Sequence, residues 1–195
     1  MNFPVNFLGL ALVAAILVPC SSGAAELNLA TLSCDSYENQ IMNSDPSSQK
    51  EDALDVVMWL FGFAVAKSGA TAMYGDALQQ FGNALDRACK NTPAQSLLEA
   101  LGTVKPVTAN PMELTELDCA TFEARNTDMM RSDPQSANTI MMWLLGFAVG
   151  KSGGHVLDAA SVGRFGTALA AQCEKRTGQS LYDALLAVKP SKLRK

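Results

Sequence analysis

The chain has 195 residues, a length that suits one or two domains, and a formal net charge of −4. Charged residues make up 17% of the chain and hydrophobic residues 48%, so the composition lies on the apolar side of the ordinary range. The modest negative charge makes no general case for nucleic-acid binding.

The first 25 residues predict a secretory signal peptide. Residues 7–18 are an unbroken run of 12 apolar residues and glycines, and small residues follow as far as Ala25. Such a run is too short to cross a bilayer comfortably, whereas an apolar core before small residues is typical of a cleaved signal. A lipoprotein anchor on Cys20 is the alternative. We therefore expect export, with no stable membrane insertion after cleavage.

One stretch of the sequence occurs twice. Residues 58–69 read Met-Trp-Leu-Phe-Gly-Phe-Ala-Val-Ala-Lys-Ser-Gly, and residues 142–153 read Met-Trp-Leu-Leu-Gly-Phe-Ala-Val-Gly-Lys-Ser-Gly. Shorter matches lie on both sides, such as Ser-Asp-Pro before each copy and Lys-Pro after it. The repeat predicts two modules, residues 26–106 and 107–195, arranged either as tandem globular domains or as one fused pseudo-dimer.

Each module is predicted to be a small all-α unit of four helices. In the first module a short helix carries Cys34, a longer one runs from about residue 50 to 67, and a third runs from about residue 76 to 90. The third helix and its repeat place apolar side chains on one face at helical spacing. These are Leu78, Phe81, Leu85 and Cys89 in the first copy, and Val162, Phe165, Leu169 and Cys173 in the second.

Turn and cap signals place the remaining boundaries. Gly69 lies where the long helix should stop, and Ser48 with Glu51 has the spacing of a capping box at its start. A fourth short helix is predicted from Thr92, with Pro93 in its first turn. Residues 106–116 contain two prolines and several small or polar residues, and they are predicted to form a linker.

Four cysteines remain after signal removal, and the repeat selects one of their three pairings. Equivalent positions predict disulfides between Cys34 and Cys89 and between Cys119 and Cys173. Each loop closure is worth roughly 4 kcal/mol in the chain-entropy model, which matters for a module of about 75 residues with a small core. The sequence has no Cys-x-x-Cys pair, so no metal ligand set is predicted.

The other candidate sites do not support an enzyme or a cofactor. Gly-Lys-Ser at 150–152 lacks the glycine spacing and the preceding strand of a phosphate loop, and it fits the end of a helix. His155 has no partner pattern for catalysis and is expected on the surface. The acidic group Glu51, Asp52 and Asp55 opens a helix, where the helix dipole favours negative charge.

The apolar residues of the two long helices are predicted to form the module cores. They are Met58, Trp59, Phe61 and Phe63 in the first copy, and Met142, Trp143 and Phe147 in the second. However, the segment 58–66 is apolar on every side, and a small module cannot cover all of it. Some of its surface should pack against the sister copy, a second chain or a client, with Gly62 and Gly146 permitting close helix approach.

These features resemble the HdeA/HdeB family of periplasmic acid-stress chaperones. The shared pattern is a Cys followed three residues later by an aromatic residue, then Trp-x-x-Gly-Phe and Lys-Ser-Gly, and then a second Cys before a short final helix. In this sequence the pattern comprises Cys34, Tyr37, Trp59 to Phe63 and Cys89 in the first copy, and Cys119, Phe122, Trp143 to Phe147 and Cys173 in the second.

The resemblance implies a non-enzymatic, ATP-independent holdase that is inactive near neutral pH. In strong acid it would expose its apolar residues and hold unfolded periplasmic proteins. Below about pH 3 most carboxyl groups are protonated, so 15 Lys and Arg plus His155 give a charge near +16. The two modules would dock on each other, or the chain would form a homodimer. The alternative function is a non-catalytic periplasmic binding module for one dedicated protein partner, of the immunity or envelope-assembly type.

Overall fold

A computed structural model describes residues 26–42, 50–73, 77–105 and 112–189, and this part of the chain is mostly helical. The first module contains α1 (Cys34–Tyr37), the π-helix η1 (Glu38–Met42), α2 (Lys50–Ser68), α3 (Leu78–Asn91) and α4 (Leu97–Thr103). The second contains α5 (Cys119–Ser132), α6 (Pro134–Lys151), α7 (Ala159–Lys175) and α8 (Leu181–Ala187). The prediction of two small helical modules, each with one disulfide, is confirmed.

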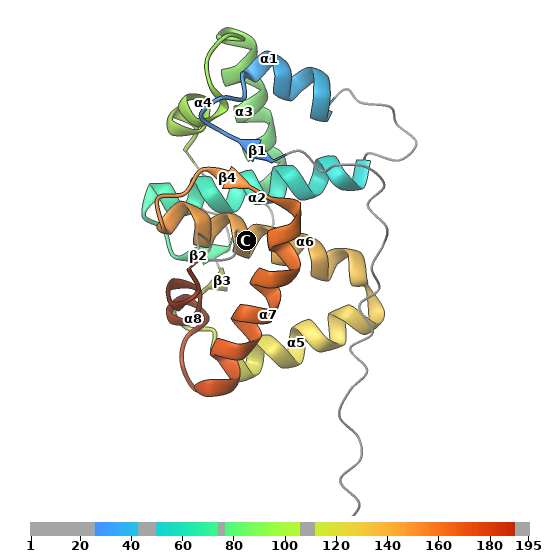
Figure 1. The fold of residues 1–195 in the computed structure, drawn as a ribbon, viewed down its shortest axis with the longest axis vertical. Helices are drawn as coiled ribbons and strands as arrows, with labels where there is room; N and C mark the ends of the chain where they lie inside the picture. Colours follow the sequence, from blue (N-terminus) through green and yellow to red (C-terminus); the bar gives the residue numbers. More distant parts are fainter. Residues whose placement is uncertain (1–25, 43–49, 74–76, 106–111, 190–195) are drawn as a thin grey trace, which may run out of the picture.

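The two Trp-containing helices, α2 and α6, lie side by side through the middle of the molecule (Figure 1). Helices α1, α3 and α4 lie on one side of this pair, and α5, α7 and α8 lie on the other. The pair is parallel, because Asp55 contacts Thr139 in the first halves of the two helices, while a Cβ atom on Gly150 would lie 2.9 Å from Phe63 O in the second halves. Buried side chains from both modules form one continuous cluster. The two modules therefore pack around one shared core.

Short strands join the modules to each other. Strand β1 (Leu27–Asn28) pairs antiparallel with β4 (Val156–Leu157), and β2 (Ala72–Met73) pairs antiparallel with β3 (Met112–Glu113). Each pair therefore joins the segment before the first helix of one module to the segment after the long helix of the other. The sequence analysis did not anticipate these strands, since two residues are too few to show an alternating pattern.

The ends of the long helices follow the sequence signals. Gly69 has a φ of 85° and Gly153 a φ of 77°. Each glycine therefore ends its helix in the left-handed backbone conformation that glycine tolerates. The expected stop at Gly69 is thus confirmed. The predicted cap at Ser48 and the side chain of Glu51 lie outside the described residues.

The predicted start of the fourth helix is wrong. Thr92 ends α3 instead, and the next helix begins after Ser96, whose hydroxyl accepts a hydrogen bond from Glu99 N while the Glu99 carboxylate accepts one from Ser96 N. The segment between the two helices hydrogen bonds to α1 instead, because Pro93 O accepts a hydrogen bond from Asp35 N. A reciprocal capping box therefore determined the start of this helix rather than the proline.

The predicted linker is shorter than expected. Of residues 106–116, Met112 and Glu113 form β3, and Leu114 is fully buried. The Leu114 amide donates to Thr71 O in the first module at 2.9 Å. This end of the segment is therefore part of the packed fold. Within the described residues, the structure has no helix that is both long and apolar enough to cross a membrane.

Candidate functional site

The predicted apolar residues gather at the contact between α2 and α6. Trp59, Trp143 and Phe147 have no exposed surface, and only Met58 among the set is half-buried rather than buried. The buried members are Trp59, Phe61, Phe63, Met142, Trp143 and Phe147. Phe61 meets Trp143 across the pair, and each of Phe61 and Phe147 also meets a ring of its own module, Phe81 and Tyr182 respectively.

Small residues bring the two helix backbones together. A Cβ atom on Gly62 would overlap the carbonyl oxygen of Trp143 and lie 3.0 Å from Phe147 N. A Cβ atom on Gly146 would likewise overlap the carbonyl oxygen of Trp59. Because the obstacles are backbone atoms, no side-chain rotation relieves them. The predicted close approach at both glycines is confirmed, and it requires glycine at each position.

Aromatic rings fill the space around this close contact. The rings of Phe61 and Trp143, which belong to different modules, meet edge to face with centroids 6.4 Å apart. Within the second module, Trp143 stacks on Phe147 at 5.4 Å. Lys151, the lysine of the Gly-Lys-Ser stretch, places its Nζ 5.4 Å from the Phe147 ring centroid. This lysine therefore covers an aromatic ring at the end of α6.

Polar contacts fix the other end of the helix pair. The carboxylate of Asp55 in α2 accepts hydrogen bonds from Asn138 Nδ2 at 2.5 Å and from Thr139 Oγ1 at 3.2 Å, both in α6. The sequence analysis assigned Asp55 only to the helix dipole. The missed signal was that Thr139 occupies the equivalent position of the repeat, so an acceptor and a donor meet across the pair.

The strand pairs extend this contact in a nearly symmetric way. Leu29 N donates to His155 O at 2.9 Å, and Leu114 N donates to Thr71 O at the same distance. Thr71 Oγ1 also donates to Glu113 Oε2 at 3.1 Å. His155, expected on the surface, is half-buried, and its carbonyl accepts the hydrogen bond from Leu29 N of the first module.

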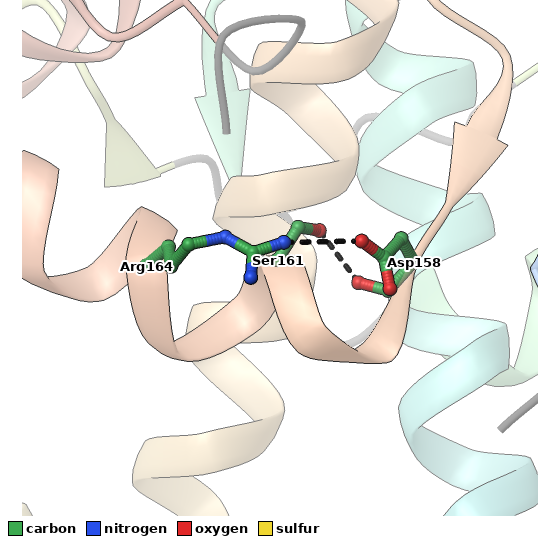
Figure 2. A network of polar contacts seen from close by, with 3 residues as sticks. All are labelled: Asp158, Ser161 and Arg164. Carbon is green, nitrogen blue, oxygen red and sulfur yellow. Dashed lines mark hydrogen bonds and ion pairs between the residues drawn. The ribbon is translucent and has the colours of Figure 1, made fainter. Parts of the chain in front are cut away.

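A compact polar network anchors the start of α7 directly after β4. Figure 2 shows Asp158, whose carboxylate pairs with Arg164 Nη2 at 3.1 Å and whose carbonyl accepts from Ser161 Oγ at 2.6 Å. The Ser161 amide donates to the same carbonyl at 2.8 Å. These bonds fix the turn between β4 and α7, and so they hold the strand in position for β1.

Both disulfides form as predicted. Cys34 bonds to Cys89 and joins α1 to α3, while Cys119 bonds to Cys173 and joins α5 to α7. Each bond lies within one module. Neither crosses the contact between α2 and α6, so the two helices can separate while both disulfides stay intact.

Both tryptophan side chains carry a buried polar atom. The Nε1 atoms of Trp59 and Trp143 have no hydrogen-bond partner among the described residues. A buried donor without a partner costs about 1–3 kcal/mol relative to one that is hydrogen bonded. Exposure of this surface to water would therefore recover part of the cost of opening it.

Two aspartates that cap helices in the second module have lowered pKa values. Hydrogen bonds from the Thr121 amide and hydroxyl hold the pKa of Asp118 below its ordinary value of 3.8. Hydrogen bonds from the Ser136 hydroxyl and amide do the same for the pKa of Asp133. Each carboxylate stabilises the start of a helix while it is ionised.

Two glutamates at equivalent positions show the opposite shift. Burial, followed by repulsion from Asp86, raises the pKa of Glu38 above 4.5. Burial, followed by repulsion from Glu174, raises the pKa of Glu123 above the same value. Ionisation of both glutamates therefore disfavours the folded state near neutral pH.

These shifts predict a maximum of stability in mild acid. As the pH falls through the raised pKa values of Glu38 and Glu123, the folded state takes up protons and the free energy of unfolding rises. Below about pH 4 the unfolded state takes up more protons at Asp118 and Asp133, and the free energy of unfolding falls. Urea unfolding midpoints between about pH 2 and 8 measure this curve.

The repeat supplies a matched control for this prediction. Asp118→Ser copies Ser33, which caps α1 through its hydroxyl and does not titrate. This variant should lose less stability in strong acid than the unmodified protein does. A midpoint that falls steadily from pH 7, with the same slope in Asp118→Ser, would contradict the assignment.

Comparison with known proteins gives one match. No curated protein and no solved structure matches the chain. The model of the HdeA/HdeB family matches residues 102–183, a segment that includes α5, α6 and α7 with both cysteines of the second module.

Proposed function

We propose that this protein is a periplasmic, acid-activated holdase chaperone that works without ATP. The observation that carries the proposal is the contact between α2 and α6, where Phe61 of the first module meets Trp143 of the second and both rings are buried. Opening of this contact would present Trp59, Phe61 and Phe63 together with Met142, Trp143 and Phe147 to an unfolded client. Apolar surface of this kind is the main source of affinity for unfolded chains.

Charge supplies the acid trigger. Residues 26–106 hold 5 basic and 10 acidic residues, for a net charge of −5, and residues 107–195 hold 10 basic and 9 acidic, for +1. With every carboxyl group protonated and His155 charged, the same segments carry +5 and +11. A weak attraction between the modules thus becomes a repulsion in strong acid. The same positive charge would keep a complex with a client soluble.

The covalent arrangement suits opening without complete unfolding. The disulfides persist in acid and hold α1 to α3 and α5 to α7, while the α2–α6 contact has only noncovalent bonds. We also propose that the first module is a second copy of the family matched by residues 102–183, since it repeats the cysteine and tryptophan pattern. The surface that a separate partner chain would cover is then covered within one chain.

A chaperone assay tests the proposal. The purified mature protein is mixed with a protein that aggregates in acid, and light scattering is followed at about pH 2.5 and at pH 7. We expect suppression of scattering only in acid, together with a rise in the fluorescence of a dye that binds apolar surface. Because opening occurs within one chain, the dye signal per molecule should not change over a hundredfold range of protein concentration.

Two results would count against the proposal. Absence of suppression at both pH values would remove the chaperone function. A dye signal in acid that grows on dilution would show that separate chains dissociate, and it would remove the proposed opening within one chain.

A further inference from the structure

A second apolar surface lies away from the α2–α6 contact, in a groove of the first module. The groove has a volume of about 490 Å³ and is formed by α1 with η1, by α2 and by α3. Met42 and Leu54 line it and are 45% and 36% exposed. They are two of the five large apolar side chains that are exposed within the described residues. The groove thus presents apolar side chains to solvent in the closed protein.

Acidic side chains stand beside this apolar surface. Glu38 and Asp86 both line the groove, and burial and the charge of Asp86 raise the pKa of Glu38. Lys90 pairs with Asp86 at 2.8 Å, so these three groups sum to one net negative charge at neutral pH. The first module as a whole carries −5. A cationic group next to Glu38 would relieve the repulsion between the two carboxylates.

The second module repeats Glu38 as Glu123 but lacks three other side chains in or beside the groove. Positions 84 residues beyond Leu54, Asp86 and Lys90 hold Asn138, Ala170 and Glu174. The first Ser-Asp-Pro begins 10 positions after Cys34, whereas the second begins 13 positions after Cys119. The short α1 with η1 thus corresponds to a continuous α5 of 14 residues. The exposed Leu54 beside the Asp86–Lys90 pair is thus particular to the first module.

We propose that the groove is a docking site for a short segment of another protein, in which a large apolar side chain is flanked by lysine or arginine. The apolar side chain would lie between Met42 and Leu54, and the cation would face Glu38 and Asp86. This combination of an apolar anchor with a charge on the rim is the usual form of helix-in-groove recognition. The site does not depend on the proposed chaperone function, because it is open while α2 and α6 remain packed.

Gly82 provides a direct way to block the groove. It lines the groove from α3, and a Cβ atom added there meets nothing within 4 Å. Its equivalent in α7, Gly166, is equally free of neighbours. Gly82→Leu therefore fills the groove, and Gly166→Leu makes the same change on the second module as a control.

Binding of a synthetic peptide tests the proposal. The probe is a dye-labelled peptide of about 12 residues with leucine on one helical face and lysine elsewhere, and its counterpart has glutamate in place of lysine. Fluorescence anisotropy with the full mature protein at pH 7 should show binding of the lysine peptide only. We expect Gly82→Leu to weaken binding at least tenfold, Glu38→Gln about two- to fivefold, and Gly166→Leu less than twofold.

A second variant and three possible results decide whether the proposal is wrong. Leu54→Asn, which copies Asn138, replaces Gly82→Leu if circular dichroism shows that the leucine variant has lost its fold, and it should also weaken binding. Equal binding to the unmodified protein, Gly82→Leu and Leu54→Asn would overturn the proposal, as would equal binding of both peptides. If Gly82→Leu instead changes the sedimentation coefficient of the protein alone, a second copy occupies the groove, and the proposal is wrong.

Discussion

Alanine at Gly62 and Gly146 is expected to force α2 and α6 apart at neutral pH. Each new methyl group would overlap a backbone carbonyl oxygen of the opposite helix, that of Trp143 or that of Trp59. Overpacking costs about 1–3 kcal/mol where side chains can adjust, and here the obstacle is backbone. We expect each variant to lose at least about 3 kcal/mol of unfolding free energy, as measured by urea denaturation.

The same variants should open the α2–α6 contact without acid. If the α2–α6 contact hides the client-binding surface, the Gly62→Ala/Gly146→Ala double variant should bind the apolar dye and suppress client aggregation at pH 7. Its far-ultraviolet circular dichroism should stay close to that of the unmodified protein, because the disulfides and the remaining helices of each module are unchanged.

Glycines elsewhere in the chain give the control. Gly82 and Gly166 also lie within helices, but a Cβ atom at either meets nothing within 4 Å. Alanine at these positions should leave the dye signal unchanged and should raise stability by up to about 1 kcal/mol, through helix propensity. Similar behaviour of both pairs of variants would show that close helix approach is not the reason for glycine at Gly62 and Gly146.

Features that depend on long, repeated patterns were predictable from the sequence. The equivalence of Cys34 with Cys119 and of Cys89 with Cys173 selected the disulfide pairing. The all-round apolar character of residues 58–66 implied a surface that one module cannot cover, and the structure places the other module against it. The first inference rests on the repeat, and the second rests on the constraint that apolar surface needs a partner.

Features that depend on a few residues brought together by folding were not predictable. Strands of two residues carry no alternation, so β1 and β3 gave no signal that they join the modules. The contact of Asp55 with Asn138 and Thr139 joins positions more than 80 residues apart, and each side chain alone fits a solvated helix start. The start of α4 was misplaced because Pro93 and Ser96 give competing local signals. Tertiary contacts decided the first two cases, and the local capping box of Ser96 and Glu99 decided the third.

Removal of either disulfide is expected to destabilise the whole protein rather than one module. The loops closed by Cys34–Cys89 and Cys119–Cys173 span 55 and 54 residues, so each bond is worth about 4 kcal/mol in the chain-entropy model. Buried side chains of both modules form one cluster, so we expect the protein to unfold in one cooperative transition. Serine at either cysteine pair should lower the urea midpoint of that single transition. Urea denaturation followed by tryptophan fluorescence measures the shift.

The effect on function should be largest in acid. At neutral pH the packed α2–α6 contact still supports a module that has lost its disulfide, whereas in strong acid repulsion between the modules removes that support. A module without its disulfide then has no cross-link that holds its first helix to its third. We expect both serine variants to lose client protection in acid, with little difference between the modules. If either variant instead protects clients as well as the unmodified protein does, an unfolded chain with exposed aromatic residues is sufficient for activity, and the defined surface on α2 and α6 is not required.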